Sequence, residues 1–251
     1  MSQSLKRGVD ALMYLASRKC AGVTEIAGAL NVNKSTAFRI METFMPDNIV
    51  EKNPDTAQYK LGPAILKLAD RYYSSLSAAG VSRPHMERLS EILGESVHLC
   101  VVSNNRAVVI DQIAASGILM ANAKIGSTEP LHASSVGKCL VAFASEVRKE
   151  RMFEELQYEI YTHNTVKNKE EMIQEIEKIR NLGYAIDNTE LSPDVRCVAA
   201  PIFNNKSECN YSIGVSGPIS RMNEGKIERV IREILRTTKK ISAELGYEAQ
   251  E

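Results

Sequence analysis

The feature that most constrains the fold is a pair of short amphipathic segments near the start of the chain. In residues 24–30 and 34–44, apolar side chains recur at helical spacing: Ile26, Ala27 and Leu30, then Ala37, Ile40, Met41 and Phe44. We expect Thr24 to cap the first helix, and Asn31 tolerates the left-handed backbone of a tight turn between the two. The pattern predicts a helix-turn-helix.

The segments on either side extend this into a small domain. Residues 4–17 form an amphipathic helix whose apolar stripe consists of Leu5, Val9, Leu12, Met13 and Ala16. Residues 49–52 and 58–61 flank the turn sequence at 53–56, which predicts a two-stranded wing. Gly62-Pro63 then opens a helix that runs to about Ser77. We therefore expect a winged helix-turn-helix domain over residues 1–62 and a linker helix over residues 63–82.

The remainder, residues 83–251, mixes strands with helices and predicts an α+β domain. A short helix at 84–93 is expected to start at Pro84 and to end before Gly94. Strands are expected at 97–103, 107–113, 118–124, 184–187, 195–203 and 209–215. Helices are expected at 135–144, 146–156 and 169–182, and an amphipathic helix from Ile227 to Leu245 closes the chain.

Composition narrows the class of protein. The 31 Lys and Arg residues balance the 31 Asp and Glu residues, so a nucleic-acid surface has to be local. The five cysteines are scattered, odd in number and never form C-x-x-C, which indicates reduced thiols in the cytosol and no structural metal. No segment reads as a signal peptide or as a membrane span of roughly 18 apolar residues. We expect a cytoplasmic protein without cofactor, metal or membrane partner.

The second helix of the helix-turn-helix carries a polar outer face that suits the major groove of DNA. This face consists of Lys34, Ser35, Thr36 and Arg39. The two hydroxyls would bind phosphates or base edges, and the guanidinium would pair with a phosphate or a guanine. Arg7 and Lys60 are candidate backbone contacts. The alternative is a structural or protein-binding module with a solvated polar face.

Several blocks that span nearly the whole chain resemble the IclR family of transcriptional regulators. They are LKRGVDAL (5–12), VTEIA (23–27), NKSTAFR (33–39), YKLG (59–62), PLHASSVGK (130–138), LGYA (182–185), DVRCVAAPI (194–202) and SGPISR (216–221). The resemblance implies a regulator that binds double-stranded operator DNA. It also implies a carboxy-terminal effector domain with a GAF-like or profilin-like sheet, whose ligands in the family are small carboxylates, sugar acids and aromatic acids.

By matching positions, the resemblance places an effector pocket on one set of residues: Ser135, Val136, Asp187, Val195, Cys197, Gly214 and Ser216, with Ile118, Ala121 and Glu129 at its rim. A helix that starts at Ser135 offers backbone amides to an anion, although Ser134 or Ser135 as a simple cap explains the same residues. Two positions depart from the family pattern. Gly214 replaces a common serine, and Asp194 replaces the usual glycine before Val-Arg-Cys.

Other functions use the same residues. Cys197, Cys139, His132 and Glu190 contain the ingredients of a thiol nucleophile and base, but no local catalytic signature surrounds them, so we expect no enzyme. A zinc site from His98, His132, Cys197 and Asp187 lacks close ligand spacing. Two alternatives remain: a DNA-binding protein whose larger domain only oligomerises, and a sensor that acts through protein partners. The sequence thus predicts a metabolite-controlled regulator that works as a homodimer or homotetramer, since paired recognition helices read paired half-sites.

Overall fold

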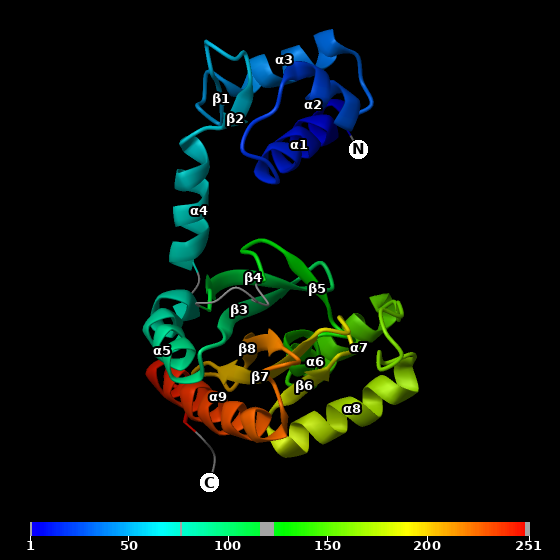
Figure 1. The fold of residues 1–251 in the computed structure, drawn as a ribbon, viewed down its shortest axis with the longest axis vertical. Coiled ribbons are helices and arrows are strands. Elements are labelled where there is room, and N and C mark those ends of the chain that lie inside the picture. The colour runs from blue at the N-terminus through cyan, green and yellow to red at the C-terminus, as the bar shows by residue number, and fades with distance from the viewer. Residues whose placement is uncertain (1, 76, 116–122, 249–251) are drawn as a thin grey trace. The chain divides into compact units, whose positions relative to one another are not determined.

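The computed structural model describes residues 2–75, 77–115 and 123–248, which belong to two compact units (Figure 1). The first unit comprises Met1–Leu76 and the second Ser77–Glu251. Each unit encloses its own buried apolar side chains, so we describe them separately.

The amino-terminal unit is a helix-turn-helix followed by a two-stranded wing. Its elements are α1 (Gln3–Ala16), α2 (Val23–Ala29), α3 (Lys34–Phe44), β1 (Val50–Lys52), β2 (Tyr59–Leu61) and α4 (Ala64–Ser75). The core gathers Leu15, Ile26, Met41 and Tyr59, all nearly inaccessible to solvent. Asn31 adopts a positive φ of 50° between α2 and α3, as expected for a tight turn. β1 and β2 pair antiparallel.

Two local expectations for this unit are corrected. The helix α2 is capped by Gly22, because the Glu25 carboxylate accepts the Gly22 backbone N–H at 2.7 Å, and Thr24 lies inside the helix. In α1, the predicted apolar stripe is not the buried face. Leu5, Val9 and Met13 are 70%, 50% and 66% exposed, whereas the helix buries a second line of small and apolar residues, Gly8, Ala11 and Leu15.

The carboxy-terminal unit is built on a six-stranded antiparallel sheet with the order β5-β4-β3-β8-β7-β6. Its strands are β3 (Ser96–Ser103), β4 (Arg106–Ile113), β5 (Thr128–Pro130), β6 (Ala185–Asn188), β7 (Val195–Phe203) and β8 (Cys209–Pro218). Its helices are α5 (Ser77–Leu93), α6 (Ser135–Ala142), α7 (Glu146–Glu155), α8 (Lys169–Leu182) and α9 (Glu224–Glu244). The sequence did not predict β5, and residues 118–122 of the strand expected at 118–124 lie outside the described residues.

Helix α5 corrects the expectation that a helix starts at Pro84. The proline lies inside α5, which begins at Ser77. A proline within a helix removes one backbone hydrogen bond and crowds the preceding turn. Here α5 packs against α9 and against β3 and β4, and it buries Met86, Leu89 and Leu93. This packing stabilises the helix through the proline, because tertiary contacts override local propensity.

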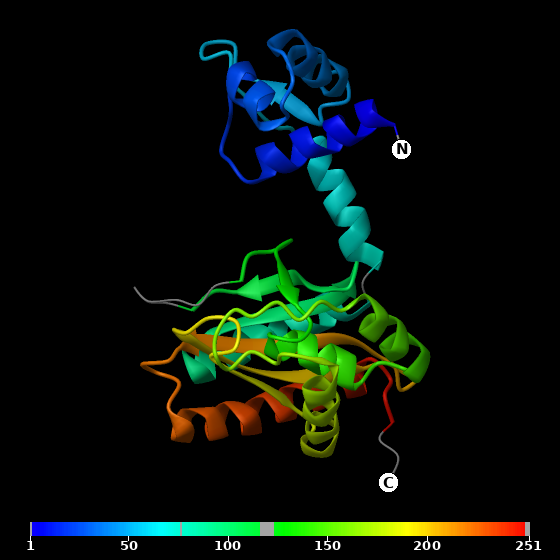
Figure 2. The ribbon, with the colours of Figure 1, turned by 90° about the vertical axis from the view of Figure 1, so that its right-hand side faces the viewer.

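The sheet is covered on both faces. Helix α6 packs against β7, β8, β6, β3 and β4, with α8 behind it, and shares a buried cluster with Ala185 and Ala199 of the sheet. The alternating side chains of β7 and β8, Val198, Ala200, Ile213 and Val215, are buried as well. Helices α5 and α9 lie side by side, and Figure 2 shows α9 running along the sheet. Among the described residues, no helix has the length and apolar character required to span a bilayer.

Candidate functional site

The outer face of α3 is the first candidate site. The helix buries Ala37 and Met41 and exposes Lys34, Ser35 and Arg39, with Thr36 half-buried. Asn33 caps the helix, and its Oδ1 accepts hydrogen bonds from the Thr36 backbone N–H and the Ser35 hydroxyl, both at 2.8 Å. Within the described part of the chain, the side chains of Lys34 and Arg39 form no ion pair or hydrogen bond. These two cations are therefore available to an anionic partner.

The wing and α1 hold the other two cations that the sequence singled out. Lys60 lies on β2, exposed, and its Nζ is 2.9 Å from Glu51 on β1, so part of its charge is neutralised. Arg7 lies half-buried on α1. The Nζ of Lys52 on β1 lies 5.5 Å from the ring centre of Phe38, which joins the wing to α3. This contact links the wing to the helix that carries Lys34 and Arg39.

The second candidate site is the face of the large sheet that α6 covers. The strand register aligns Asp187 on β6 with Cys197 on β7 and Ser216 on β8, so their side chains share one face. The Ser216 hydroxyl donates to Cys197 Sγ at 3.1 Å. Val195 lies on the same face, two residues before Cys197. Four residues from three neighbouring strands thus share one face.

The start of α6 completes this face. Ser134 caps the helix, because its Oγ accepts the Gly137 backbone N–H at 3.1 Å and donates to the Pro130 carbonyl at 2.8 Å. A Cβ on Gly137 would lie 2.6 Å from Leu131 Cα, so glycine is required there for close packing. Both features fit the capping explanation for Ser134 and Gly137. Ser135 and Val136, the first residues of α6, are buried.

Of the remaining residues predicted for the pocket, the structure describes two and leaves two outside the described residues. Gly214 lies under Val136, since a Cβ at position 214 would be 2.7 Å from Val136 Cγ1. Glu129 lies on β5, and its charge contributes to raising the pKa of Cys197, which places it near the same face. Ile118 and Ala121 lie outside the described residues.

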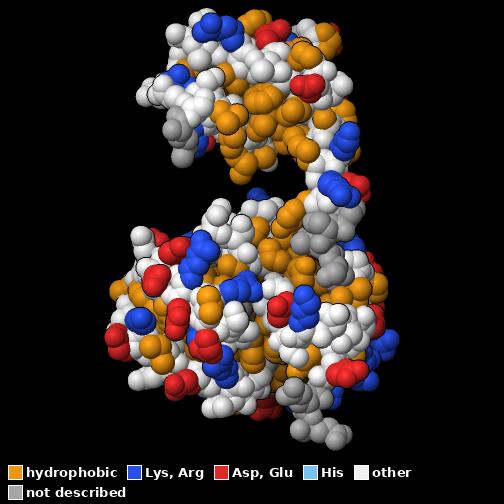
Figure 3. Space-filling model, turned by 180° about the vertical axis from the view of Figure 1, so that it is seen from behind, with side chains coloured by type: hydrophobic (Ala, Val, Ile, Leu, Met, Phe, Trp, Pro, Cys, Tyr) orange, Lys and Arg blue, Asp and Glu red, His pale blue; other side chains and the backbone are white. Residues whose placement is uncertain are grey.

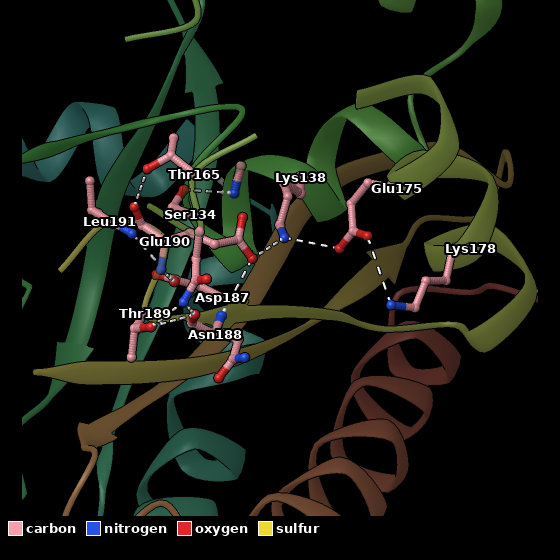
Figure 4. Close-up of polar contacts among 12 residues, drawn as sticks. Ser134, Lys138, Thr165, Glu175, Lys178, Asp187, Asn188, Thr189, Glu190 and Leu191 are labelled. Atoms are coloured by element: carbon pink, nitrogen blue, oxygen red, sulfur yellow. Dashed lines mark hydrogen bonds and ion pairs between the residues drawn. The ribbon is translucent and has the colours of Figure 1, made fainter. Parts of the chain in front are cut away.

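A buried lysine network supports the loop that follows Asp187, and Figure 4 shows its members. Lys138 of α6 is fully buried, and its Nζ lies 2.6 Å from Glu190 Oε1 and 3.0 Å from Glu175 Oε1. The Glu190 backbone N–H donates to Asp187 Oδ1 at 2.6 Å, and the Thr165 hydroxyl donates to the Glu190 carbonyl at 2.7 Å. Through Glu190, Lys138 therefore connects α6 to Asp187 and to the loop that follows it. In the sequence, Lys138 is only the last residue of the block PLHASSVGK, although a lysine among apolar helix residues is a usable signal of a buried charge.

Burial sets the protonation of this site. Burial raises the pKa of Asp187 to about 7, with the Glu190 charge adding to the rise, and the backbone hydrogen bond from Glu190 and the charge of Lys138 opposing it. At neutral pH the carboxyl is therefore divided between an acceptor-only form and a form that also donates. Burial, followed by the charges of Asp187 and Glu129, raises the pKa of the Cys197 thiol well above its ordinary value. The Cys197 thiol is therefore neutral on this face.

The surroundings of the residues considered for catalysis or for zinc binding do not favour either role. Burial raises the pKa of Cys139 as well, which leaves a weak nucleophile. The His132 Nε2 is already 2.8 Å from the Glu159 carbonyl oxygen. Among the described residues, no group of three His, Cys, Asp or Glu side chains is arranged to hold a metal ion.

The fold and these two sites define a helix-turn-helix protein with a separate α+β domain. Comparison with protein families agrees: residues 4–54 match the IclR helix-turn-helix domain, and residues 70–243 match the family described as bacterial transcriptional regulator IclR C-terminal. The chain belongs to the IclR family of bacterial transcriptional regulators, which are not enzymes. The resemblance seen in the sequence blocks is confirmed.

Individual relatives extend over the whole chain. The HTH-type transcriptional regulator BhcR of Paracoccus denitrificans is 29% identical over 240 residues, which cover 96% of this chain and 86% of that protein. The crystal structure of the Thermotoga maritima IclR has a TM-score of 0.84 at 25% identity and covers 98% of this chain and 100% of its own. An IclR homologue from Microbacterium hydrocarbonoxydans, complexed with 4-hydroxybenzoate, has a TM-score of 0.84 at 21% identity, covering 96% of this chain and 98% of its own. The α+β fold prediction is confirmed.

Proposed function

We propose that the amino-terminal unit binds double-stranded operator DNA with α3 in the major groove. The observation that carries this proposal is the exposed face of α3, where Lys34 and Arg39 lack partners among the described residues and Ser35 lies at the helix start. The helix N-terminus and its free amides attract phosphate, and Arg39 one turn further on reaches base edges or the backbone. Arg7, Thr36 and Lys60 add contacts at the margin.

Footprinting on the promoter beside the gene of this protein tests the DNA proposal. Arg39→Ala is expected to abolish protection and to leave the melting temperature of the chain unchanged. Arg71→Ala is the matched control, because it removes the same charge from an exposed position on α4. If Arg39 contacts a phosphate, the weaker binding that the variant retains at low salt has a salt slope smaller by about one than that of the wild type. Protection by Arg39→Ala equal to that of the wild type would remove Arg39 from the interface.

We further propose that the face covered by α6 binds a small organic, sugar or aromatic acid that controls operator affinity. Asp187, Ser216 and Ser135 offer hydrogen bonds, and Val136, Val195 and Cys197 supply an apolar wall, with Gly214 on the strand beneath Val136. Glu129 on β5 belongs to the proposed rim. The aromatic acid bound by the Microbacterium homologue supports this ligand class. Binding would shift the population between two states of the protein by its difference in affinity for them.

A thermal-shift screen of organic acids tests the sensing proposal. Ser135→Leu is expected to erase the shift that the wild type shows with its effector and to retain binding to DNA. Ser220→Leu, at an exposed position after β8, is the matched control and is expected to keep the shift. A shift that survives in Ser135→Leu would place the pocket elsewhere. No shift in the wild type with any acid would favour the alternative, a domain that only oligomerises.

We propose that the protein acts in the cytoplasm as a homodimer or homotetramer that presents paired α3 helices to paired half-sites. The exposed stripe on α1, formed by Leu5, Val9 and Met13, supports a contact between copies. Figure 3 shows a broad hydrophobic area on the amino-terminal unit, on the lower side where α1 lies in Figure 1. A second copy of α1 is apolar along the same line and would remove both stripes from water.

A further inference from the structure

One buried side chain on the α6 face has no role in the site described above. His98 lies on β3, where it pairs with Gly214 of β8, and it is 1% exposed. Neither ring nitrogen has a hydrogen-bond partner among the described residues. The other buried histidine, His132, differs, because its Nε2 is bonded to the Glu159 carbonyl. A buried N–H left unpaired costs about 1–3 kcal/mol, so His98 is unfavourable as a purely structural residue.

The position of the imidazole is defined by Gly214. A Cβ on Gly214 would lie 2.5 Å from His98 Nε2, 2.6 Å from His98 Cε1 and 2.7 Å from Val136 Cγ1. The imidazole edge therefore occupies the space that a side chain at position 214 would take, next to the first turn of α6. Gly214 has no positive φ that would itself require glycine. The missing side chain at 214 thus makes room for His98, which brings its nitrogens to the face shared by Cys197 and Ser216.

The surroundings decide what such an imidazole binds. Burial lowers the pKa of His98, and the Glu129 charge opposes this only in part, so the ring is neutral at physiological pH. A neutral imidazole carries one N–H donor and one acceptor nitrogen, and a hydroxyl carries both complementary functions. The negative charge of Glu129 disfavours a second carboxylate beside the ring, whereas the start of α6 favours one.

We propose that His98 is a specificity-determining residue of the ligand pocket and that its imidazole binds a hydroxyl group of a small hydroxylated acid. The acid's carboxylate lies toward the first turn of α6 and its hydroxyl lies beside the His98 imidazole. This inference rests on the proposed sensing function of the domain and names the ligand class more narrowly. A pocket built to pair a hydroxyl discriminates against the analogue that lacks it, because its own polar group is then left buried and unpaired.

Calorimetric titration of the full chain with matched pairs of acids tests the proposal. The pairs are 4-hydroxybenzoate and benzoate, lactate and propionate, and glycolate and acetate. At least one hydroxylated acid is expected to bind the wild type about tenfold more tightly than its partner, the equivalent of one net hydrogen bond. His98→Leu is expected to bring this ratio close to one without weakening the acid that lacks the hydroxyl. His98→Gln keeps a polar group at similar reach and is expected to retain part of the ratio.

The variants separate ligand recognition from structural support. If His98→Leu fails to fold, the same ratio is measured on His98→Ala combined with Gly214→Ala, where the alanine methyl group takes part of the vacated space and adds no hydrogen-bonding group. A ratio unchanged in the folded variants would overturn the role of His98 and leave the sensing function intact. Wild-type protein that binds neither these acids nor any acid of the thermal-shift screen would overturn the sensing function and this inference with it.

Discussion

Replacing Lys138 by methionine removes the charge that faces Glu190 and keeps a side chain of similar length. Both residues are buried, and the Lys138 Nζ lies 2.6 Å from the Glu190 carboxylate. Removing one partner of a buried ion pair costs about 3–5 kcal/mol, because the other charge remains without compensation. For a unit of this size, we expect the melting temperature at pH 8 to fall by about 6 to 20 °C.

The loss is expected to depend on pH in a defined direction. Burial raises the pKa of Glu190, and the charge of Lys138 opposes that rise. Without Lys138 the pKa of Glu190 rises further, so the folded variant is stabilised by protonation at low pH and loses that stabilisation as the pH rises through the new pKa. Thermal unfolding followed by circular dichroism should therefore show a larger loss at pH 8 than at pH 5.

Two further variants complete this test. Adding Glu190→Gln to Lys138→Met removes the unpaired charge and is expected to recover most of the lost stability at pH 8. Lys178→Met is the matched control, because Lys178 is exposed and lies 3.9 Å from Glu175, where an ion pair contributes at most about 1 kcal/mol. A loss in Lys138→Met as small as that in Lys178→Met, at both pH values, would refute the assignment of Lys138 to a buried pair.

Three more predictions concern single positions. The pKa of Asp187 is raised from 3.8 to about 7, so the stability that this carboxyl contributes is full below pH 3.8 and is lost as the pH rises through 7. Asp187→Asn should therefore flatten the fall in melting temperature between pH 5 and pH 8. An equally steep fall in the variant would contradict this. Gly137→Ala should destabilise by about 1–3 kcal/mol in urea unfolding, because backbone atoms of Leu131 and Pro130 occupy the space of the new Cβ; a neutral effect would show that α6 shifts freely. Val9→Glu should reduce the oligomeric state in analytical ultracentrifugation by placing a charge within the α1 stripe, and an unchanged sedimentation coefficient would exclude the stripe from the contact.

Much of the amino-terminal unit could be predicted from local pattern. Asn31 marks the turn, and the spacing of Ala37 and Met41 identifies the buried side of α3. The burial of α1 could not be predicted in the same way. Its periodicity shows an apolar stripe, but Gly8 and Ala11 form a second face that allows close packing, and only the neighbouring helices decide which face is covered.

The residues of the α6 face are brought together by tertiary contacts that spacing along the sequence does not predict. Asp187 and Cys197 were placed by matching family blocks, and the strand register then shows why they meet. Nothing near His98 in the sequence indicates that its ring lies over Gly214, because the two residues belong to strands far apart in the chain. Pro84 misled the helix prediction for the opposite reason, since a strong local signal was overridden by packing of α5 on α9.

Every residue of α6 is buried, a property that would determine how the domain responds to the proposed effector. Close-packed interiors do not deform gradually, because a shift of part of an ångström already forces side chains into new rotamers. A helix enclosed on all sides therefore moves between a few discrete positions or stays in place. Titration with increasing amounts of an effector should accordingly change the fraction of molecules in each arrangement, and spectra recorded along the way should be mixtures of two end states.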